Sequence, residues 1–295
     1  MNDLPNPSHG EAIPIAAADG CRSAITSYPG RGDGPVFIIL PAMGVRADYY
    51  GPLAEMLVQH GFGAVTADLR GHGHSSLRAS RRVDFGYHEM VAHDMPAVVA
   101  ATRKYFPHNP IYLLGHSLGG QLSVLYAGRF PGHVAGIVLI ASCSVYFRGW
   151  DFPANLAILL GTQSAGILAG LLGYFPGHSL GFGGRESMTT IRDWARNART
   201  GNYRASGGDH DLEAALAAMT TPVLAISLAG DRFAPQRAAR YLGDKLKRAA
   251  VNYQLLGEAQ MPAAGLDHFR WVAHTGPIVR SIQAWLTTTH NGMRN

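Results

Sequence analysis

The sequence predicts an α/β fold built on a mainly parallel central sheet with helices on both faces. Short apolar runs, each about as long as a buried strand, alternate along the chain with segments whose apolar residues recur at helical spacing. Such alternation is typical of parallel sheets, in which a helix connects one strand to the next. Hydrophobic residues make up 47% and charged residues 15% of the 295 residues, which is enough apolar material for a sizeable core.

The first half of the chain is predicted to begin with a hairpin, because Asp19-Gly20 is a turn signal between two short strands. Each helix predicted in this half is followed by a glycine or a proline that ends it. In chain order, the predicted elements are strands at 11–19, 23–28 and 36–40, a helix at 49–60, a strand at 64–68, a helix at 88–105, a strand at 111–114, a helix at 120–130 and a strand at 134–140.

A long segment from about Val145 to Met219 interrupts the alternation. The pattern then resumes with a strand at 223–228, a helix at 236–248, a strand at 251–256 and a helix at 269–286. Within the interruption, Ala154–Phe175 contains no charged residue and reaches the length of a membrane-spanning helix. Because polar residues and glycines dilute this run, and strands lie on both sides of it, we expect helices that cover an apolar pocket and no membrane contact.

The pentapeptide Gly-His-Ser-Leu-Gly occurs twice, at 115–119 and at 177–181. It matches the pattern G-x-S-x-G, in which a serine occupies a sharp turn from a strand to a helix. A predicted strand leads into the first copy and a predicted helix follows it. Around the second copy, Pro176 disfavours the strand and the glycines at 183 and 184 disfavour the helix. We therefore expect Ser117 to be the nucleophile and Ser179 to lie in a loop.

A serine nucleophile needs a histidine as general base and a carboxylate that orients this histidine. In an open α/β sheet these groups lie in loops at the carboxyl ends of strands. Asp231 follows the strand at 223–228, and His268 lies in the loop after the strand at 251–256. The chain order serine, aspartate, histidine is the order expected when the serine occupies such a turn.

Some of these residues have structural alternatives. Asp231 is also suited to cap the helix near Gln236, and Asp267, next to His268, is a second candidate for the acid. We expect structural roles for four other polar residues: His116 in packing or at the pocket, Asp68 in an ion pair with Arg70, His274 on the final helix, and His290 in the polar tail.

The oxyanion that forms during acyl transfer needs two hydrogen-bond donors. The backbone N–H of Leu118, at the start of the helix after the serine, is the first candidate. The second should come from the loop Pro41-Ala-Met-Gly44, which follows the strand at 36–40. Because proline has no N–H, either Ala42 or Met43 must donate, and we favour Met43.

Over residues 11–288 the chain resembles the α/β-hydrolase superfamily. The resemblance rests on Gly115-His-Ser-Leu-Gly-Gly120, Asp68-Leu-Arg-Gly-His-Gly-His-Ser75, Gly230-Asp231 and Asp267-His268. The chain looks most similar to bacterial serine hydrolases of the monoacylglycerol lipase and serine aminopeptidase branch. The resemblance implies an α/β-hydrolase fold, a triad of Ser117, His268 and Asp231, and an acyl-enzyme intermediate. It also implies a core of 11–144 and 220–288, with 145–219 as an inserted helical cap that shapes the acyl pocket.

We therefore expect a serine hydrolase that cleaves a small-molecule carboxylic ester, or a thioester, with an apolar acyl group. An amidase or peptidase would use the same triad, so this alternative stays open. The chain departs from the family pattern at Pro41-Ala42, where members usually carry His-Gly, and a non-catalytic binding protein with this fold is therefore a further alternative.

Within the implied cap, Arg192, Arg196 and Arg199 share one helical face. This face is either solvated or, if it lies at the mouth of the pocket, suited to a phosphate- or carboxylate-bearing substrate such as an acyl thioester of coenzyme A. Five aromatic residues are expected to serve packing, namely Trp150, Phe152, Tyr174, Phe175 and Phe182.

Charge and composition exclude several other functions. The net charge is +5, with 22 arginines and 3 lysines, but no block of like charge suggests nucleic-acid binding. The histidines, including His72 and His74, complete no zinc pattern, so we expect neither a metal nor a cofactor. Cys21 and Cys143 have no redox spacing and the N-terminus shows no secretory signal, which favours a cytoplasmic setting. A homodimer is compatible with the sequence.

Overall fold

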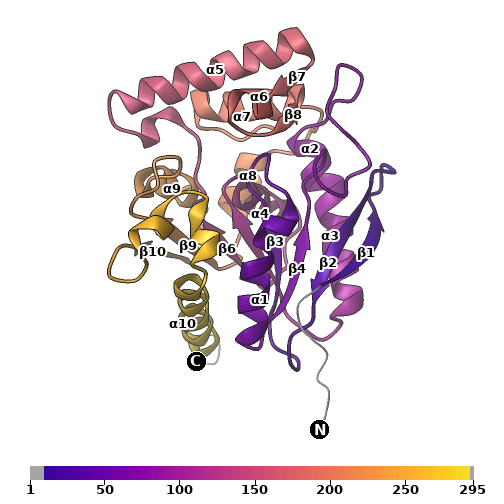
Figure 1. Ribbon diagram of the computed structural model, residues 1–295, viewed down its shortest axis with the longest axis vertical. Helices are drawn as coiled ribbons and strands as arrows, with labels where there is room; N and C mark the ends of the chain where they lie inside the picture. Colours follow the sequence, from indigo (N-terminus) through magenta and orange to yellow (C-terminus); the bar gives the residue numbers. More distant parts are fainter. Residues whose placement is uncertain (1–9, 293–295) are drawn as a thin grey trace.

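Residues 10–292 of the chain are described by a computed structural model, shown in Figure 1. Its centre is an eight-stranded sheet with the strand order β1-β2-β4-β3-β5-β6-β9-β10. The bounds of these strands are β1 Glu11–Ala16, β2 Arg22–Tyr28, β3 Val36–Leu40, β4 Gly63–Ala67, β5 Ile111–His116, β6 Gly136–Ile140, β9 Val223–Leu228 and β10 Val251–Leu256. Strands β1 and β2 pair antiparallel, as do β2 and β4, and every other pair in this sheet is parallel. The predicted α/β fold with a mainly parallel sheet is confirmed.

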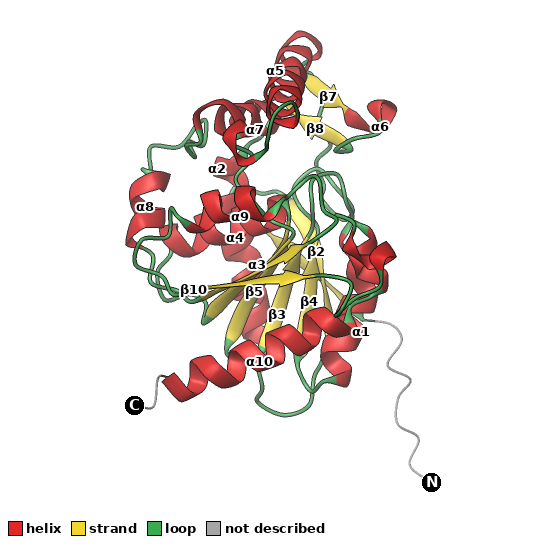
Figure 2. Cartoon of the chain, turned by 90° about the vertical axis from the view of Figure 1, so that its left-hand side faces the viewer, coloured by secondary structure: helices red, strands yellow, loops and turns green. Residues whose placement is uncertain are grey.

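Helices cover both faces of the sheet (Figure 2). Along β3, Val36, Ile38 and Leu40 join one apolar cluster, whereas Phe37 and Ile39 join the other, because successive side chains of a strand point to opposite faces. The first cluster is completed by α3 (Met95–Tyr105), α4 (Leu118–Arg129) and α8 (Leu212–Ala218), and the second by α1 (Gly51–Gln59), α9 (Gln236–Gly243) and α10 (Gly276–Gly292). This two-sided burial explains why the central strands are almost wholly apolar.

The predicted strands all form, although β1 ends at Ala16 and not at residue 19. The helix predicted at 49–60 begins with a 3-10 turn, Ala47–Tyr50, before α1, and three other predicted helices are broken or shortened. The helix predicted at 88–105 consists of α2 (Tyr87–Glu89), a π-helical turn (Met90–Asp94) and α3. The helix predicted at 236–248 ends at Gly243, since glycine is a weak helix former.

The final predicted helix is also broken. It comprises a 3-10 turn (Arg270–Ala273) followed by α10, and His274 lies between them with a non-helical backbone. Placing His274 on the final helix was therefore wrong. Pro277 explains the break, because a proline has no N–H and fits only the first turn of a helix.

Most of the segment between β6 and β9 lies beyond the carboxyl ends of the parallel strands (Figure 1). It contains α5 (Ala154–Leu172), β7 (Tyr174–Pro176), α6 (Gly177–Leu180), β8 (Arg185–Ser187) and α7 (Met188–Thr200). Strands β7 and β8 form a separate antiparallel pair, and α5 packs against α7. Helix α8, the last element before β9, instead packs against α4.

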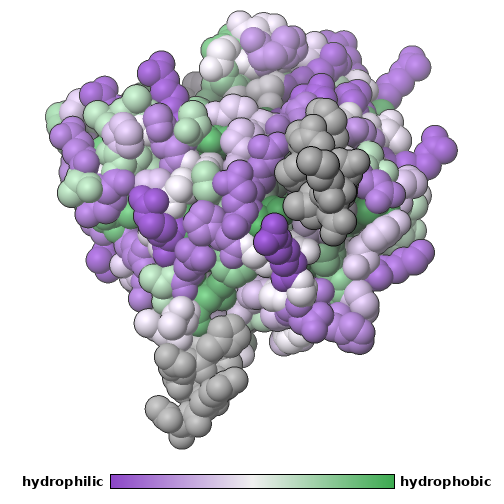
Figure 3. Space-filling view, turned by 60° about the horizontal axis from the view of Figure 1, so that its bottom comes forward, coloured by the Kyte–Doolittle hydropathy of each residue, from purple (hydrophilic) through white to green (hydrophobic). Residues whose placement is uncertain are grey.

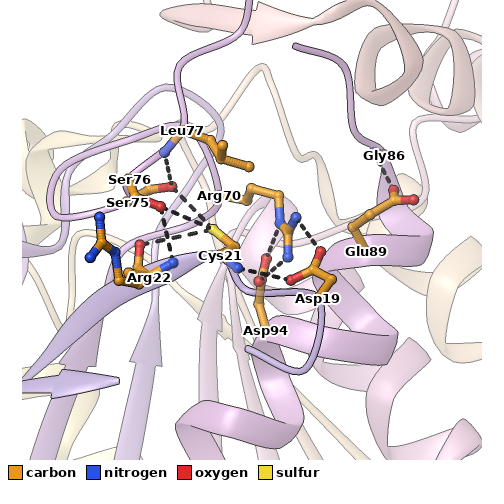
Figure 4. Close-up of polar contacts among 10 residues, drawn as sticks. All are labelled: Asp19, Cys21, Arg22, Arg70, Ser75, Ser76, Leu77, Gly86, Glu89 and Asp94. Carbon is orange, nitrogen blue, oxygen red and sulfur yellow. Dashed lines mark hydrogen bonds and ion pairs between the residues drawn. The ribbon is translucent and has the colours of Figure 1, made fainter. Parts of the chain in front are cut away.

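Arg70 ties the first hairpin to the rest of the core (Figure 4). Its guanidinium donates to Asp19 Oδ2 at 2.6 Å and to both carboxylate oxygens of Asp94 at 2.9 and 2.6 Å. The prediction that Arg70 pairs with Asp68 was wrong. Asp68 accepts instead from the backbone N–H groups of Ala47 and His74, so each buried charge is balanced by a different set of partners.

Candidate active site

Ser117 occupies a sharp turn between β5 and α4. Its φ of 51° and ψ of −114° lie in a region that residues with a side chain rarely adopt. The surrounding hydrogen bonds hold this conformation: the Ser117 N–H donates to the Ile140 oxygen at 3.2 Å, and the Ser142 hydroxyl donates to the Ser117 oxygen at 2.7 Å. A Cβ at Gly119 would collide with the backbone of Leu40, so this tight turn requires a glycine. The strand, turn and helix predicted around the first pentapeptide are therefore present.

The second copy of the pentapeptide has a different local structure. Ser179 lies on the single turn of helix that forms α6 and is exposed, so the predicted loop was wrong. A three-residue strand, β7, leads into this copy despite Pro176, because the proline stands at the last position of a two-stranded sheet, where its missing N–H is tolerated. Ser179 does not share the positive φ of Ser117. The structure thus gives only the first serine the geometry of a nucleophile elbow.

Asp231 and His268 lie side by side at the carboxyl ends of β9 and β10. Asp231 Oδ2 and His268 Nδ1 are 2.7 Å apart, and both side chains are buried. The other carboxylate oxygen of Asp231 accepts from the N–H groups of Phe233 and Ala234, at 2.8 and 3.0 Å. The aspartate therefore closes its own turn and contacts the histidine. It does not cap α9, whose N-cap is Pro235 without a side-chain hydrogen bond, so the capping role considered for Asp231 was wrong.

Asp267, the alternative acid, has a different role. Its carboxylate is exposed and accepts from the backbone N–H groups of Phe269 and Arg270 at 3.0 and 3.2 Å. These hydrogen bonds lower the pKa of Asp267, the one from Phe269 contributing most. Because they begin a 3-10 turn, Asp267 shapes the loop that carries His268 and does not contact its imidazole among the hydrogen bonds found in residues 10–292.

Ser117 and His268 line one pocket of about 110 Å³. Most of its walls are apolar and come from both the sheet loops and the segment above them, namely Ala42, Met43, Leu118, Cys143, Val145, Trp150, Ile158, Phe182, Trp194, Phe233 and Phe269. Gln121 adds an amide to the lining, and its Oε1 accepts a hydrogen bond of 3.2 Å from the Tyr87 hydroxyl. Such a pocket suits a substrate with an apolar group next to the serine.

The loop after β3 offers one free donor toward this pocket. The N–H of Ala42 is already used, because it donates to the Tyr50 hydroxyl at 3.0 Å. Met43 and Leu118 both line the pocket, and within residues 10–292 their N–H groups have no hydrogen-bond acceptor. The two residues predicted to donate to an oxyanion therefore both line the pocket that Ser117 lines, with N–H groups not engaged elsewhere in the described residues.

His116, beside the nucleophile, belongs to a buried network that the sequence did not reveal. Its Nδ1 lies 2.7 Å from the Tyr50 hydroxyl, and its Nε2 lies 3.5 Å from the indole nitrogen of Trp271. Its ring is 4.9 Å from that of His268. Burial, followed by the proximity of His268, lowers the pKa of His116 far below its usual range, so the ring is neutral. This neutral ring connects the loop after β3, through Tyr50 and Ala42, to the segment after His268, through Trp271.

The five aromatic residues and three arginines singled out between 145 and 219 lie at different places. Trp150 and Phe182 line the pocket, whereas Phe152 is exposed and Tyr174 and Phe175 lie outside the lining. The three arginines of α7 line a separate groove against α5 that shares no residue with the serine pocket. The condition for an anion-binding role at the mouth of the serine pocket is therefore not met.

Aromatic residues near the histidine were not predicted. Phe233 lies two residues after Asp231 and its ring centroid is 5.4 Å from that of His268, while Trp194 reaches the same pocket from α7. The position of Trp194 depends on how the segment above the sheet folds back, which no local pattern indicates, whereas Phe233 lies in the same loop after β9 as Asp231. Within residues 10–292 no cluster of His, Cys, Asp or Glu has the geometry to hold a metal ion.

Comparison with known proteins gives sequence matches over part of the chain and structural matches over nearly all of it. Residues 34–165 match the family model described as serine aminopeptidase, S33. The chain is 38% identical to human monoglyceride lipase over 33% of this chain and 31% of that protein. It is 33% identical to a pimeloyl-acyl-carrier-protein methyl ester esterase from Shewanella, over 45% of this chain and 46% of the relative. The chain thus spans less than half the length of these curated relatives.

The similarity of structure extends over nearly the entire molecule. A solved esterase from Exiguobacterium antarcticum superposes with a TM-score of 0.61, at 17% sequence identity, over 94% of this chain and 100% of that one. At such low identity the likeness establishes the fold alone. Together, the sheet order, the serine turn and this superposition identify an α/β-hydrolase fold.

Proposed function

We propose that this chain, which has an α/β-hydrolase fold, is a serine hydrolase that cleaves carboxylic esters with an apolar acyl group. The observation that carries the proposal is the shared pocket of Ser117 and His268, with Asp231 hydrogen-bonded to the far side of the imidazole at 2.7 Å. The names of the relatives, a lipase and a methyl ester esterase, support ester hydrolysis as the reaction.

In the proposed reaction, the Ser117 hydroxyl attacks the ester carbonyl carbon while His268 Nε2 accepts its proton. Asp231 holds the imidazole through Nδ1 and stabilises the positive charge that develops on it. The negative charge on the carbonyl oxygen is stabilised by the N–H groups of Met43 and Leu118. When the tetrahedral intermediate collapses, the alcohol leaves with the proton from His268 and the acyl group stays on the serine.

Water completes the cycle. His268 removes a proton from a water molecule, which attacks the acyl-enzyme and forms a second tetrahedral intermediate. Its collapse releases the carboxylic acid and returns the proton to Ser117. A thioester would follow the same steps with a thiol as the leaving group. The triad therefore does not discriminate between an ester and a thioester, and the shape of the pocket determines which of them binds.

We propose that the segment 145–219 acts as the cap that selects the acyl group. Its Val145, Trp150, Ile158, Phe182 and Trp194 supply apolar walls of the serine pocket. Because the pocket is only about 110 Å³, short acyl chains should react better than long ones in the conformation described.

Hydrolysis of p-nitrophenyl esters of graded acyl length tests the proposal. The Ser117→Ala variant should lose activity by a factor on the order of 10⁴ to 10⁶, since loss of the nucleophile leaves only binding and oxyanion stabilisation. Ser179→Ala is the matched control, because it removes the serine of the same pentapeptide from an exposed helical turn, and it should keep full activity. A Ser117→Ala variant that hydrolyses these esters at the rate of the unmodified protein would refute the assignment.

A further inference from the structure

Helix α5 is apolar on two sides. By length and composition it could cross a membrane. Its inner side is packed, with Thr162, Ala165 and Ala169 buried and α7 alongside. Its outer side exposes Leu156, Leu160, Ile167 and Leu171, whose exposed fractions are 45%, 65%, 65% and 74%. Spacings of four, seven and four residues put these side chains in one stripe along the helix.

The exposed apolar side chains of the protein are concentrated at this helix. Ten large hydrophobic residues are exposed among residues 10–292, and five of them lie between Phe152 and Leu171. Scattered apolar residues are normal on a protein surface, but a contiguous group marks an interaction site. The opposite end of the molecule, seen in Figure 3, instead shows hydrophilic side chains interspersed with apolar ones. The stripe therefore points to a partner with an apolar surface.

A positively charged groove runs beside the stripe. It has a volume of about 540 Å³, and Ile167 and Leu171 of α5 line it together with Arg192, Arg196 and Arg199 of α7. Arg196 pairs with Asp193 at 3.1 Å. The other two guanidinium groups have no hydrogen bond or ion pair within the described part of the chain, and α5 itself carries no charge. The partner should therefore present negative charge next to its apolar surface.

We propose that the outer side of α5 and the adjoining arginines dock on a phospholipid bilayer that contains anionic headgroups. The leucine and isoleucine side chains would enter the boundary of the acyl chains, while Arg192 and Arg199 would bind phosphates. The helix lies along the surface and does not span the bilayer, because leaving the protein would expose its packed inner side. From the sequence we expected this helix to cover the pocket and not to contact a membrane. That expectation describes the inner side of α5, from which Ile158 reaches the serine pocket, but not its exposed outer side.

Flotation with vesicles tests the apolar part of the proposal. The protein should float with vesicles of phosphatidylcholine containing phosphatidylglycerol and bind more weakly to pure phosphatidylcholine, with the difference reduced by salt. The double variant Ile167→Glu/Leu171→Glu should lose binding to both vesicle types by at least about tenfold. Its matched control is Leu255→Glu, which places a charge on an exposed leucine of β10 and should bind as the unmodified protein does. Circular dichroism and thermal unfolding verify that each variant is folded.

The charged part has its own pair of variants. Arg192→Gln/Arg199→Gln should weaken binding to the anionic vesicles on the order of tenfold and leave binding to neutral ones unchanged. Lys247→Gln/Arg248→Gln removes the same charge from an exposed segment before β10 and should change neither. The docking does not depend on catalysis, so Ser117→Ala should float normally even if the proposed reaction is wrong.

Three results would overturn the inference. The protein could stay at the bottom of the gradient with anionic vesicles, or both arginine double variants could reduce binding equally. It could also form a dimer in light scattering that Ile167→Glu/Leu171→Glu converts to a monomer, which would make a second copy the partner of α5.

Discussion

The two copies of Gly-His-Ser-Leu-Gly have the same sequence and different structures. In the first copy, Ser117 lies in a strained turn between a central strand and a long helix, and it lines one pocket together with His268. In the second, Ser179 lies exposed on one turn of helix after a three-residue edge strand. The comparison shows that the backbone conformation at the serine depends on the flanking strand and helix, and not on the pentapeptide itself.

The largest expected effect concerns Asp231, the carboxylate that we propose orients His268 for the serine of the first copy. Asp231→Asn should reduce ester hydrolysis by a factor on the order of 10⁴, because the amide no longer stabilises the positively charged imidazole or fixes its tautomer. The matched control is Asp267→Asn, next to the histidine, which should retain most of the activity because Asp267 caps a 3-10 turn. Steady-state rates with one p-nitrophenyl ester compare the two, and a stronger loss in Asp267→Asn would reassign the acid.

The glycines that close each pentapeptide give the next comparison. In Gly119→Ala the added Cβ would collide with the backbone of Leu40 and open the turn, so the variant should lose activity and about 3 kcal/mol or more of stability. In Gly181→Ala the φ of 74° is unfavourable but the space is open, so the loss should be about 1 kcal/mol with activity retained. Urea unfolding and ester hydrolysis measure both effects. Equal losses in the two variants would show that the serine turn is not specially constrained.

The histidines of the two copies should also differ. His116→Ala removes a fully buried ring from the Tyr50 and Trp271 network and should cost about 2–4 kcal/mol of stability, whereas His178→Ala changes an exposed residue and should cost nothing measurable.

The pH dependence of stability identifies the role of His116. Since its pKa is lowered in the folded state, the unfolded chain takes up a proton below the ordinary value of about 6.5 while the folded chain does not. The free energy of unfolding should therefore fall as the pH drops below about 6.5, and it should fall less steeply in His116→Gln. Parallel profiles for the two proteins between pH 7.5 and 5 would contradict a neutral buried His116.

The smallest expected effect concerns the hydrogen bond between His72 and Glu186. It joins β8, the strand after the second copy, to the loop after β4 of the central sheet. His72 Nε2, in the loop after β4, lies 2.8 Å from Glu186 Oε1 on β8; the Glu186 side chain is buried and that of His72 is largely buried. Burial alone would lower the pKa of His72, but the hydrogen bond and charge of Glu186, aided by Asp68, outweigh it and raise the pKa.

A histidine with a raised pKa stabilises the folded state below about pH 6.5 and loses this contribution as the pH rises through its folded pKa. His72→Gln should thus be less stable than the unmodified protein by about 1 kcal/mol at pH 6, with a smaller difference at pH 9. His178→Gln, which changes an exposed histidine on α6, is the control. A difference that grows with pH would show that the pair is not ionic.

The sequence predicted the sheet well because its central strands are buried on both faces, so five- and six-residue apolar runs such as Val36–Leu40 and Val223–Leu228 match the strands residue for residue. It also predicted where Ser117, Asp231 and His268 lie, since each follows a strand end. It did not predict the Tyr50–His116–Trp271 network or the position of Trp194, because these contacts join residues far apart in the chain. The breaks in the long helices depend on single residues such as Pro277, whose effect the apolar periodicity conceals.

Labelling with a fluorophosphonate tests most directly whether Ser117, and not Ser179, is the activated serine. Such a probe reacts with an activated serine, and mass spectrometry of the digested protein locates the modified peptide. The folded protein should be labelled on Ser117, and the label should be absent from Asp231→Asn and from protein denatured beforehand. Label on Ser179, or a folded protein that is never labelled, would contradict the account.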